Sequence, residues 1–269
     1  MKQSILIAMT VLLFTGCMPQ STPQPPQASC LNSAQLSNYG YDSLARVANL
    51  LREDKKNIDT FDGFISAMKV TVNNYATMIK SSVYISNVVR FLPIPYAGEI
   101  SNTTKLISKT ALHLSVAADA LDHYKKSSAS FLDSFDKLSP NTVQPAELAR
   151  LATFADSVLL RDARNLQVSL KQISESTGMM AATTQSIADA LDTTGNYFSQ
   201  AKNYVGFSKT SAAASTSDKT KVNENRNSIN ARMMQLNQKI TLLEHSADTN
   251  RLNIEKARIY TDLAVQLSQ

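Results

Sequence analysis

Apolar residues recur at alternating spacings of three and four along most of the chain. This spacing keeps one face of a helix against a partner helix, as in coiled coils, and we call that face the seam of its helix. The pattern is interrupted at Pro93, at Pro140 and across residues 206–220, which are small and polar. We therefore predict four long helices, near 42–91, 99–138, 145–205 and 220–268.

Short connections join the first three of these helices, which favours antiparallel neighbours. At 1.5 Å per residue the helices would be roughly 60 to 90 Å long. We predict an all-α fold over residues 42–269, an elongated antiparallel four-helix bundle that resembles a coiled coil. In this topology the turn at 91–98 and a mobile loop at 206–220 lie at one end of the bundle.

Three irregularities interrupt the seams. Asp54 occupies a seam position, so a break in the first helix near residues 54–60 is one interpretation. In the third helix the steps from Ala155 to Leu159 and on to Ala163 are two consecutive fours, eight residues in place of seven, and this extra four is a stutter that loosens a supercoil. Asn250 lies on the fourth seam, where it would need a polar partner across the bundle and would fix the register.

Residues 17–41 lack this periodicity. The segment 18–29 (MPQSTPQPPQAS) is rich in Pro and Gln, which predicts an extended, semi-rigid tether. Residues 38–41 (NYGY) have turn chemistry, and Asp42 is a plausible N-cap. The first helix is therefore expected to begin near residue 42.

The N-terminus has a different pattern. Residues 5–14 are apolar except for Thr10, and Lys2 precedes them. A helix of this length covers about 15 Å, half of the hydrocarbon core of a bilayer, so it is too short to span. An ordinary secretory signal or a buried apolar helix would share these features. The small residues Thr15 and Gly16 then lead directly to Cys17.

The run Phe14-Thr15-Gly16-Cys17 resembles the end of a bacterial lipoprotein signal peptide, although the family has Leu at the first position. The resemblance implies that residues 1–16 are a signal peptide cleaved before Cys17. It also implies a diacylglyceryl thioether and an acylated amino group on Cys17, which would anchor the chain in a lipid bilayer. Because Met18 is not Asp, the family's sorting rule favours the outer membrane in a Gram-negative cell.

Composition supports helices and gives few further leads. The chain has seven Gly, no Trp and a net charge of +5. The basic excess lies within 219–258, where a patch for anionic lipid or glycan and a simply solvated helix face are both possible. Aromatic and basic residues are not interleaved along the sequence, so nucleic acid is not expected as a partner. With Cys17 assigned to lipid, Cys30 is either a bystander or the site of an intermolecular disulfide.

No catalytic or metal-binding motif emerges. The three histidines, His113, His123 and His245, are not spaced to share one metal. HExxH, CxxC, G-x-S-x-G and Gly-rich phosphate loops are absent from the sequence. We therefore predict neither an enzyme nor a bound cofactor.

The turn at 91–98 is apolar where a loop is normally polar, through Phe91, Leu92, Ile94 and Tyr96. These side chains would either fold back to plug the bundle end or form an exposed tip that enters a membrane or a partner's groove. Secreted α-helical pore-forming toxins are similar in general layout.

Two functions follow from these patterns. The first is a membrane-anchored lipoprotein of the cell envelope whose bundle is an interaction or spacer module, with another envelope protein or surface as its partner. The alternative is a membrane-active effector that uses the apolar turn.

Overall fold

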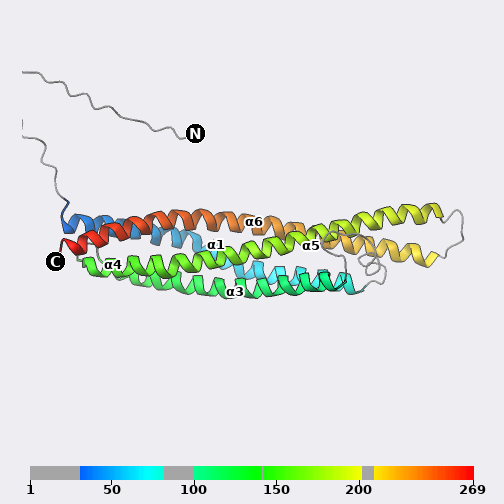
Figure 1. The fold of residues 1–269 in the computed structure, drawn as a ribbon, viewed down its shortest axis with the longest axis horizontal. Helices are drawn as coiled ribbons and strands as arrows, with labels where there is room; N and C mark the ends of the chain where they lie inside the picture. The colour runs from blue at the N-terminus through cyan, green and yellow to red at the C-terminus, as the bar shows by residue number, and fades with distance from the viewer. Residues whose placement is uncertain (1–30, 82–99, 141, 202–208) are drawn as a thin grey trace, which may run out of the picture. The chain divides into compact units, whose positions relative to one another are not determined.

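The computed structural model describes residues 31–81, 100–140, 142–201 and 209–269, and the regular elements in these ranges are helices. Residues Asn32–Gln269 form one compact unit. Its elements are α1 (Ser33–Ser81), α3 (Ile100–Asp136), α4 (Pro145–Phe154), the π-helical turn η1 (Ala155–Leu159), α5 (Leu160–Ala201) and α6 (Lys209–Gln266) (Figure 1). Because α4, η1 and α5 follow one another without a break, they make one of four long helices.

The helices pack antiparallel around a square, in which α1 and α5 each lie between α3 and α6. Side-chain contacts show the register of α1 and α6. Ser33 Oγ donates to the carbonyl oxygen of Ala264 at 2.8 Å, and the hydroxyls of Thr71 and Ser228 lie 3.3 Å apart. The predicted all-α antiparallel four-helix bundle is therefore confirmed.

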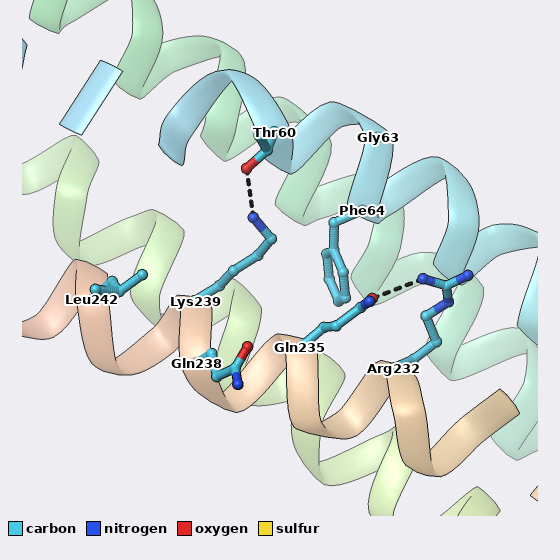
Figure 2. A pocket seen from close by; sticks show the side chains of 8 residues that line it. All are labelled: Thr60, Gly63, Phe64, Arg232, Gln235, Gln238, Lys239 and Leu242. Atoms are coloured by element: carbon cyan, nitrogen blue, oxygen red, sulfur yellow. Dashed lines mark hydrogen bonds between the residues drawn. The ribbon is translucent and has the colours of Figure 1, made fainter. Parts of the chain in front are cut away.

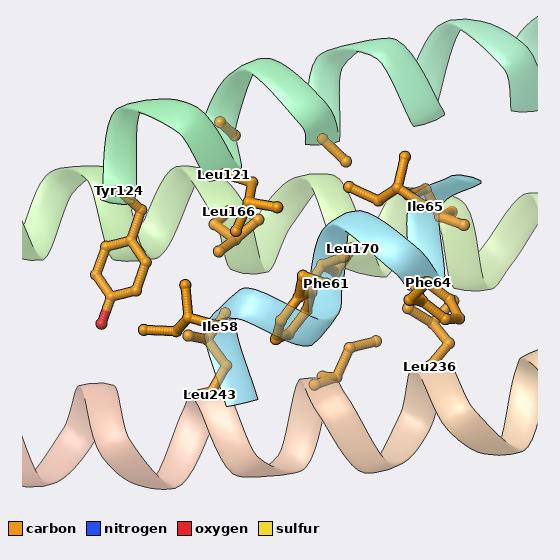
Figure 3. Close-up of a cluster of buried hydrophobic side chains, with 14 of the residues drawn as sticks. Ile58, Phe61, Phe64, Ile65, Leu121, Tyr124, Leu166, Leu170, Leu236 and Leu243 are labelled. Carbon is orange, nitrogen blue, oxygen red and sulfur yellow. The ribbon is translucent and has the colours of Figure 1, made fainter. Parts of the chain in front are cut away.

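The core runs between the four seams as one continuous cluster. Figure 3 shows part of it, with side chains from all four helices meeting: Phe61, Ile65, Leu121, Leu166, Leu170, Leu236 and Leu243. Removing a Leu side chain of this kind from water contributes about 1.5–3 kcal/mol, so the apolar seams supply most of the driving force for assembly.

The start of α1 corrects the sequence prediction. The helix begins at Ser33, not near residue 42, and runs through the segment expected to be a turn. Asn32 Oδ1 accepts the backbone N–H of Gln35 at 2.9 Å, and Gln35 Oε1 accepts the N–H of Asn32 at 3.1 Å. This reciprocal capping box satisfies two donors of the first turn. The predicted boundary between the tether and the first helix, at residue 41, therefore lies too late in the sequence.

Gly40 lies inside α1 for a packing reason. A Cβ at Gly40 would lie 2.7 Å from Cγ2 of Thr261 on α6, closer than real Cβ contacts allow. The adjacent rings of Tyr39 and Tyr260 lie 5.5 Å apart between centroids. Gly40 therefore permits close approach of two helices, a role that the sequence alone does not distinguish from a turn.

The start of α6 is a second correction, since residues 209–220 are helical and the loop predicted for 206–220 does not extend over them. Lys219 Nζ contacts Asp192 Oδ1 of α5 at 3.0 Å, and Asp218 and Val222 are buried. Polar, Ala-rich segments have adequate helix propensity, and packing against a neighbour decides their conformation.

The predicted stutter coincides with η1. The seam residues Ala155, Leu159 and Ala163 are all buried, so the extra residue does not turn the seam away from the core. A π turn takes one more residue than an α turn, and η1 absorbs the insertion in this way.

The two polar seam residues meet in one layer. α1 continues through Asp54 without the break considered near 54–60. Asp54 Oδ2 accepts a hydrogen bond from Ser246 Oγ, and Asn250 Nδ2 lies 3.5 Å from the same hydroxyl. Ser246 belongs to the same helix as Asn250, so Asn250 reaches Asp54 of α1 only through this hydroxyl. The direct polar partner predicted across the bundle is not found among the described residues, and the buried Oδ1 of Asn250 has no partner there.

Candidate functional site

The residues predicted from sequence to carry function lie outside the described residues. They are the lipidation site Cys17 and the apolar turn residues Phe91, Leu92, Ile94 and Tyr96. Cys30 lies outside them as well.

The histidines are separated. His113 is half-buried, and its Nδ1 lies 3.0 Å from the carbonyl oxygen of Gln172, which links α3 to α5. His123 and His245 are exposed. Across the described ranges no three His, Cys, Asp or Glu side chains gather as metal ligands. None of the described helices is both long and apolar enough to cross a membrane.

A groove of about 340 Å³ lies between α1 and α6 (Figure 2). Its lining is polar and cationic, with Phe64 at its floor: Thr60, Gly63, Phe64, Arg232, Gln235, Gln238, Lys239 and Leu242. No carboxylate, histidine or cysteine is among these lining residues. The groove therefore has the charge to attract an anionic group.

Both cations of the groove already have contacts. Lys239 Nζ donates to Thr60 Oγ1 at 2.8 Å and lies 4.3 Å from the centroid of the Phe61 ring. Burial lowers the pKa of Lys239 below its ordinary value. Arg232 Nη1 donates to Gln235 Oε1 at 2.7 Å, while its buried Nε has no partner in the described residues. The contacts with Thr60 and Phe61 show how Lys239 stabilises the packing of α1 on α6.

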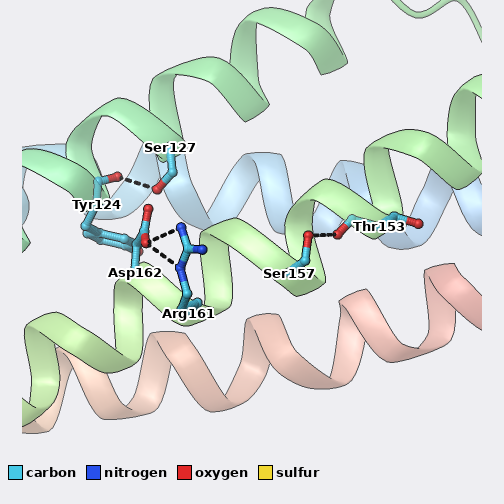
Figure 4. A network of polar contacts seen from close by, with 6 residues as sticks. All are labelled: Tyr124, Ser127, Thr153, Ser157, Arg161 and Asp162. Carbon is cyan, nitrogen blue, oxygen red and sulfur yellow. Dashed lines mark hydrogen bonds and ion pairs between the residues drawn. The ribbon is translucent and has the colours of Figure 1, made fainter.

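A polar network surrounds η1 (Figure 4). Ser157 Oγ donates to the carbonyl oxygen of Thr153 at 2.7 Å, within the turn where the π geometry begins. Just after η1, the Asp162 carboxylate is buried and accepts from Nε and Nη2 of Arg161, both at 3.2 Å. These contacts satisfy polar groups next to the irregular turn, which gives them a structural role.

The outer face of α6 carries exposed apolar side chains. Six large hydrophobic residues of this helix are 43% exposed or more: Met234, Leu242, Leu252, Ile259, Leu263 and Leu267. At about 100° per residue they fall within an arc of about 100°. Thr261 packs against α1, and Arg258 contacts Asp156 of η1, so this arc faces away from the bundle.

Three members of the arc are regularly spaced near the C-terminal end of α6. Leu252, Ile259 and Leu263 are 50%, 53% and 43% exposed, and we call them the outer row. The spacings of seven and four residues are those of a coiled-coil seam. The outer row was not predicted from the sequence, because one seam was assigned to each helix although a second period is present in the same segment.

Comparison with known protein families, characterised proteins and solved structures found no match to this chain. The class of the protein is therefore defined by its geometry, which is that of an all-α antiparallel four-helix bundle with an apolar row on one outer face.

Proposed function

We propose that this protein is a lipid-anchored protein of the bacterial cell envelope whose helical bundle is an interaction and spacer module. The outer row of α6 carries the interaction part of this proposal. The bundle buries its four seams internally, yet Leu252, Ile259 and Leu263 remain on the surface. An ordered row of exposed apolar residues is typical of a surface that binds another protein.

The anchoring part of the proposal is supported by the lipoprotein-like sequence that ends at Cys17. In a Gram-negative cell the outer membrane is the favoured location, because Met18 follows the lipid-bearing residue. The Pro-rich segment 18–29 would then separate the bundle from the bilayer, and the long helices would carry its surfaces away from the membrane.

The anchor is tested by fractionating cells that express the wild-type chain or the Cys17→Ser variant. The wild-type protein should sediment with membranes and need detergent for release, whereas Cys17→Ser should lose the lipid and with it this behaviour. Metabolic labelling with a fatty-acid analogue should mark the wild-type protein alone. An unlabelled wild-type chain, or a Cys17→Ser chain that is still labelled, would contradict the assignment.

The interaction function is tested by placing a photo-crosslinking amino acid at exposed positions around the bundle, including Val70, Leu112, Val168 and Ile259. At least one position should give a discrete adduct with another envelope component. Release of dye from loaded anionic vesicles tests the membrane-active alternative. Dye release by the wild-type protein, lost when Phe91, Leu92 and Ile94 are replaced by Ser, would favour that alternative.

A further inference from the structure

We propose that the outer face of α6 docks an amphipathic helix of another protein, and that basic residues line one flank of that helix's apolar seam. This inference rests on the proposed function and adds to it the site and the chemistry of the partner. The outer row provides the first part of the argument. Leu252 and Ile259 are separated by two helical turns, about 10.5 Å, and Leu263 follows one turn later. A partner helix can insert its side chains between them as knobs into holes.

A row of carboxylates beside the outer row defines the charge of the partner. Asp248, Glu255 and Asp262 follow one another at seven-residue intervals, and we call them the acidic row. All three are exposed, and none forms an ion pair with the described residues. Charges that flank the seam of a coiled coil select its partner, so Lys or Arg is expected opposite these carboxylates.

The neighbouring cations offset only part of the charge of the acidic row. Arg258 is paired with Asp156 of η1 at 2.5 Å, which directs its side chain toward the bundle. Arg251 is exposed and makes no ion pair with the described residues. Lys256 occupies the seam position between Leu252 and Ile259, four residues after the first and three before the second. The face is therefore asymmetric in charge, with three carboxylates and one cation, Arg251, on one flank and the uncharged Asn253 and Tyr260 on the other.

This asymmetry disfavours a second copy of the chain as the occupant. In an antiparallel pair of outer faces, like flanks meet, so the acidic row would face its own copy. In a parallel pair the acidic row would face the opposite flank, with Asn253, Tyr260 and Leu267, which supply no cation. Neither arrangement places a cation opposite each of the three carboxylates. A different helix with Lys or Arg along one flank would do so.

Binding of designed peptides tests this proposal. The probe is a fluorescent four-heptad peptide with a Leu/Ile seam and Lys along one flank, and its matched peptide has Glu in place of every Lys. The full chain is held in nanodiscs of zwitterionic lipid, with empty nanodiscs as the blank, and binding is read by fluorescence anisotropy. The Lys peptide should bind saturably, more tightly than the Glu peptide, and more weakly as salt is raised.

Three variants locate the site. Ile259→Ser should weaken binding of the Lys peptide about tenfold or more, since it removes a central apolar contact. Glu255→Lys should reduce the preference for the Lys peptide, since it leaves two carboxylates and one cation in the acidic row. Val168→Ser, which changes a residue of α5 that is 55% exposed, should leave binding unchanged. Circular dichroism of each variant establishes that the bundle is still folded.

Other results would overturn the proposal. They are no saturable binding of the Lys peptide, equal binding of both peptides, or full binding by the Ile259→Ser variant. A wild-type dimer in sedimentation that Ile259→Ser converts to a monomer would assign the face to a second copy instead. In the cellular crosslinking experiment, adducts at Val168 but not at Ile259 would refute this site and leave the interaction function standing. No adduct at any position would contradict the interaction function itself.

Discussion

Gly40 and Gly63 lie in the same helix, but their surroundings differ. A Cβ at Gly40 would meet Thr261 Cγ2 at 2.7 Å, whereas a Cβ at Gly63 would meet nothing within 4 Å. The hydroxyl of Thr261 also bonds to the carbonyl oxygen of Arg258 at 3.1 Å, which holds its side chain in place. Glycine is thus required at one position and replaceable at the other.

We expect Gly63→Ala to raise the free energy of unfolding by about 1 kcal/mol, because Ala is the better helix former and the added methyl has room. Gly40→Ala should lower it by about 1–2 kcal/mol, since overpacking against α6 outweighs that gain. Urea unfolding followed by circular dichroism measures both. Adding Thr261→Ser, which removes the obstructing methyl, should restore stability to Gly40→Ala. A Gly40→Ala protein as stable as Gly63→Ala would contradict the packing role.

Two buried tyrosines make stability depend on alkaline pH. Burial raises the pKa of Tyr75 and of Tyr124 above the ordinary tyrosine value, and the charge of Asp54 raises that of Tyr124 further. Both tyrosines stay protonated in the folded bundle at pH values where they ionise in the unfolded chain. Their contribution is therefore complete below a pH of about 10 and is lost as pH rises above it.

We expect the free energy of unfolding to fall above a pH of about 10, with a slope approaching 1.4 kcal/mol per pH unit for each buried tyrosine. Tyr75→Phe should make the fall less steep, whatever its effect at neutral pH. Urea unfolding at a series of pH values from 8 to 11, roughly the range that spans tyrosine ionisation, measures the slope. An identical slope for the wild-type protein and Tyr75→Phe would show that Tyr75 ionises equally in both states.

At the scale of the element, η1 shows how an irregular seam is accommodated. The steps from Ala155 to Leu159 and on to Ala163 contain one residue more than the regular pattern, and the π turn takes up this residue. Regular α-helix continues on both sides, so the seam returns to the core in phase. The irregularity is local because the insertion is confined to one turn.

Deleting Ser157 should convert η1 into regular α-helix and leave the later seam of α5 facing the core. The free energy of unfolding should then stay within about 2 kcal/mol of the wild-type value, as for a moderate point mutation. Deleting Glu175, an exposed residue of regular α5, should rotate every later seam residue by about 100° and abolish cooperative unfolding. Thermal unfolding by circular dichroism compares the two. Equal damage by both deletions would show that η1 does not absorb the insertion.

At the scale of the whole molecule, the bundle has one core. Buried side chains from Leu44 in α1 to Met180 in α5 and Val222 in α6 belong to a single contiguous cluster. The polar layer of Asp54, Ser246 and Asn250 lies within the bundle without dividing this cluster. A continuous core predicts that distant parts of the bundle unfold together.

We expect Leu44→Ala and Met180→Ala each to lower the free energy of unfolding by about 2–5 kcal/mol, because both remove side chains that are fully buried. Each should shift one common transition, observed equally by circular dichroism and by intrinsic tyrosine fluorescence. Two separate transitions, with each variant moving a different one, would show instead that the bundle consists of two stacked halves.

Periodicity is a local property, so the features that depend on it could be predicted from the order of residues alone. The seams with three-and-four spacing predicted the fold class, and the extra step between Ala155 and Ala163 marked the position of η1. These features follow from one helix face considered alone.

Features that depend on two helices at once became visible only in the packed bundle. Whether Gly40 served a turn or a close contact was settled by Thr261 on α6, and the helicity of residues 209–220 became evident with their packing against α5. The exposure of Leu252, Ile259 and Leu263 likewise depends on which neighbours α6 has, because an apolar residue is buried only where a partner covers it. Hydrophobic spacing reports that a face is apolar, and the arrangement of the other helices determines whether that face is covered or left for a partner.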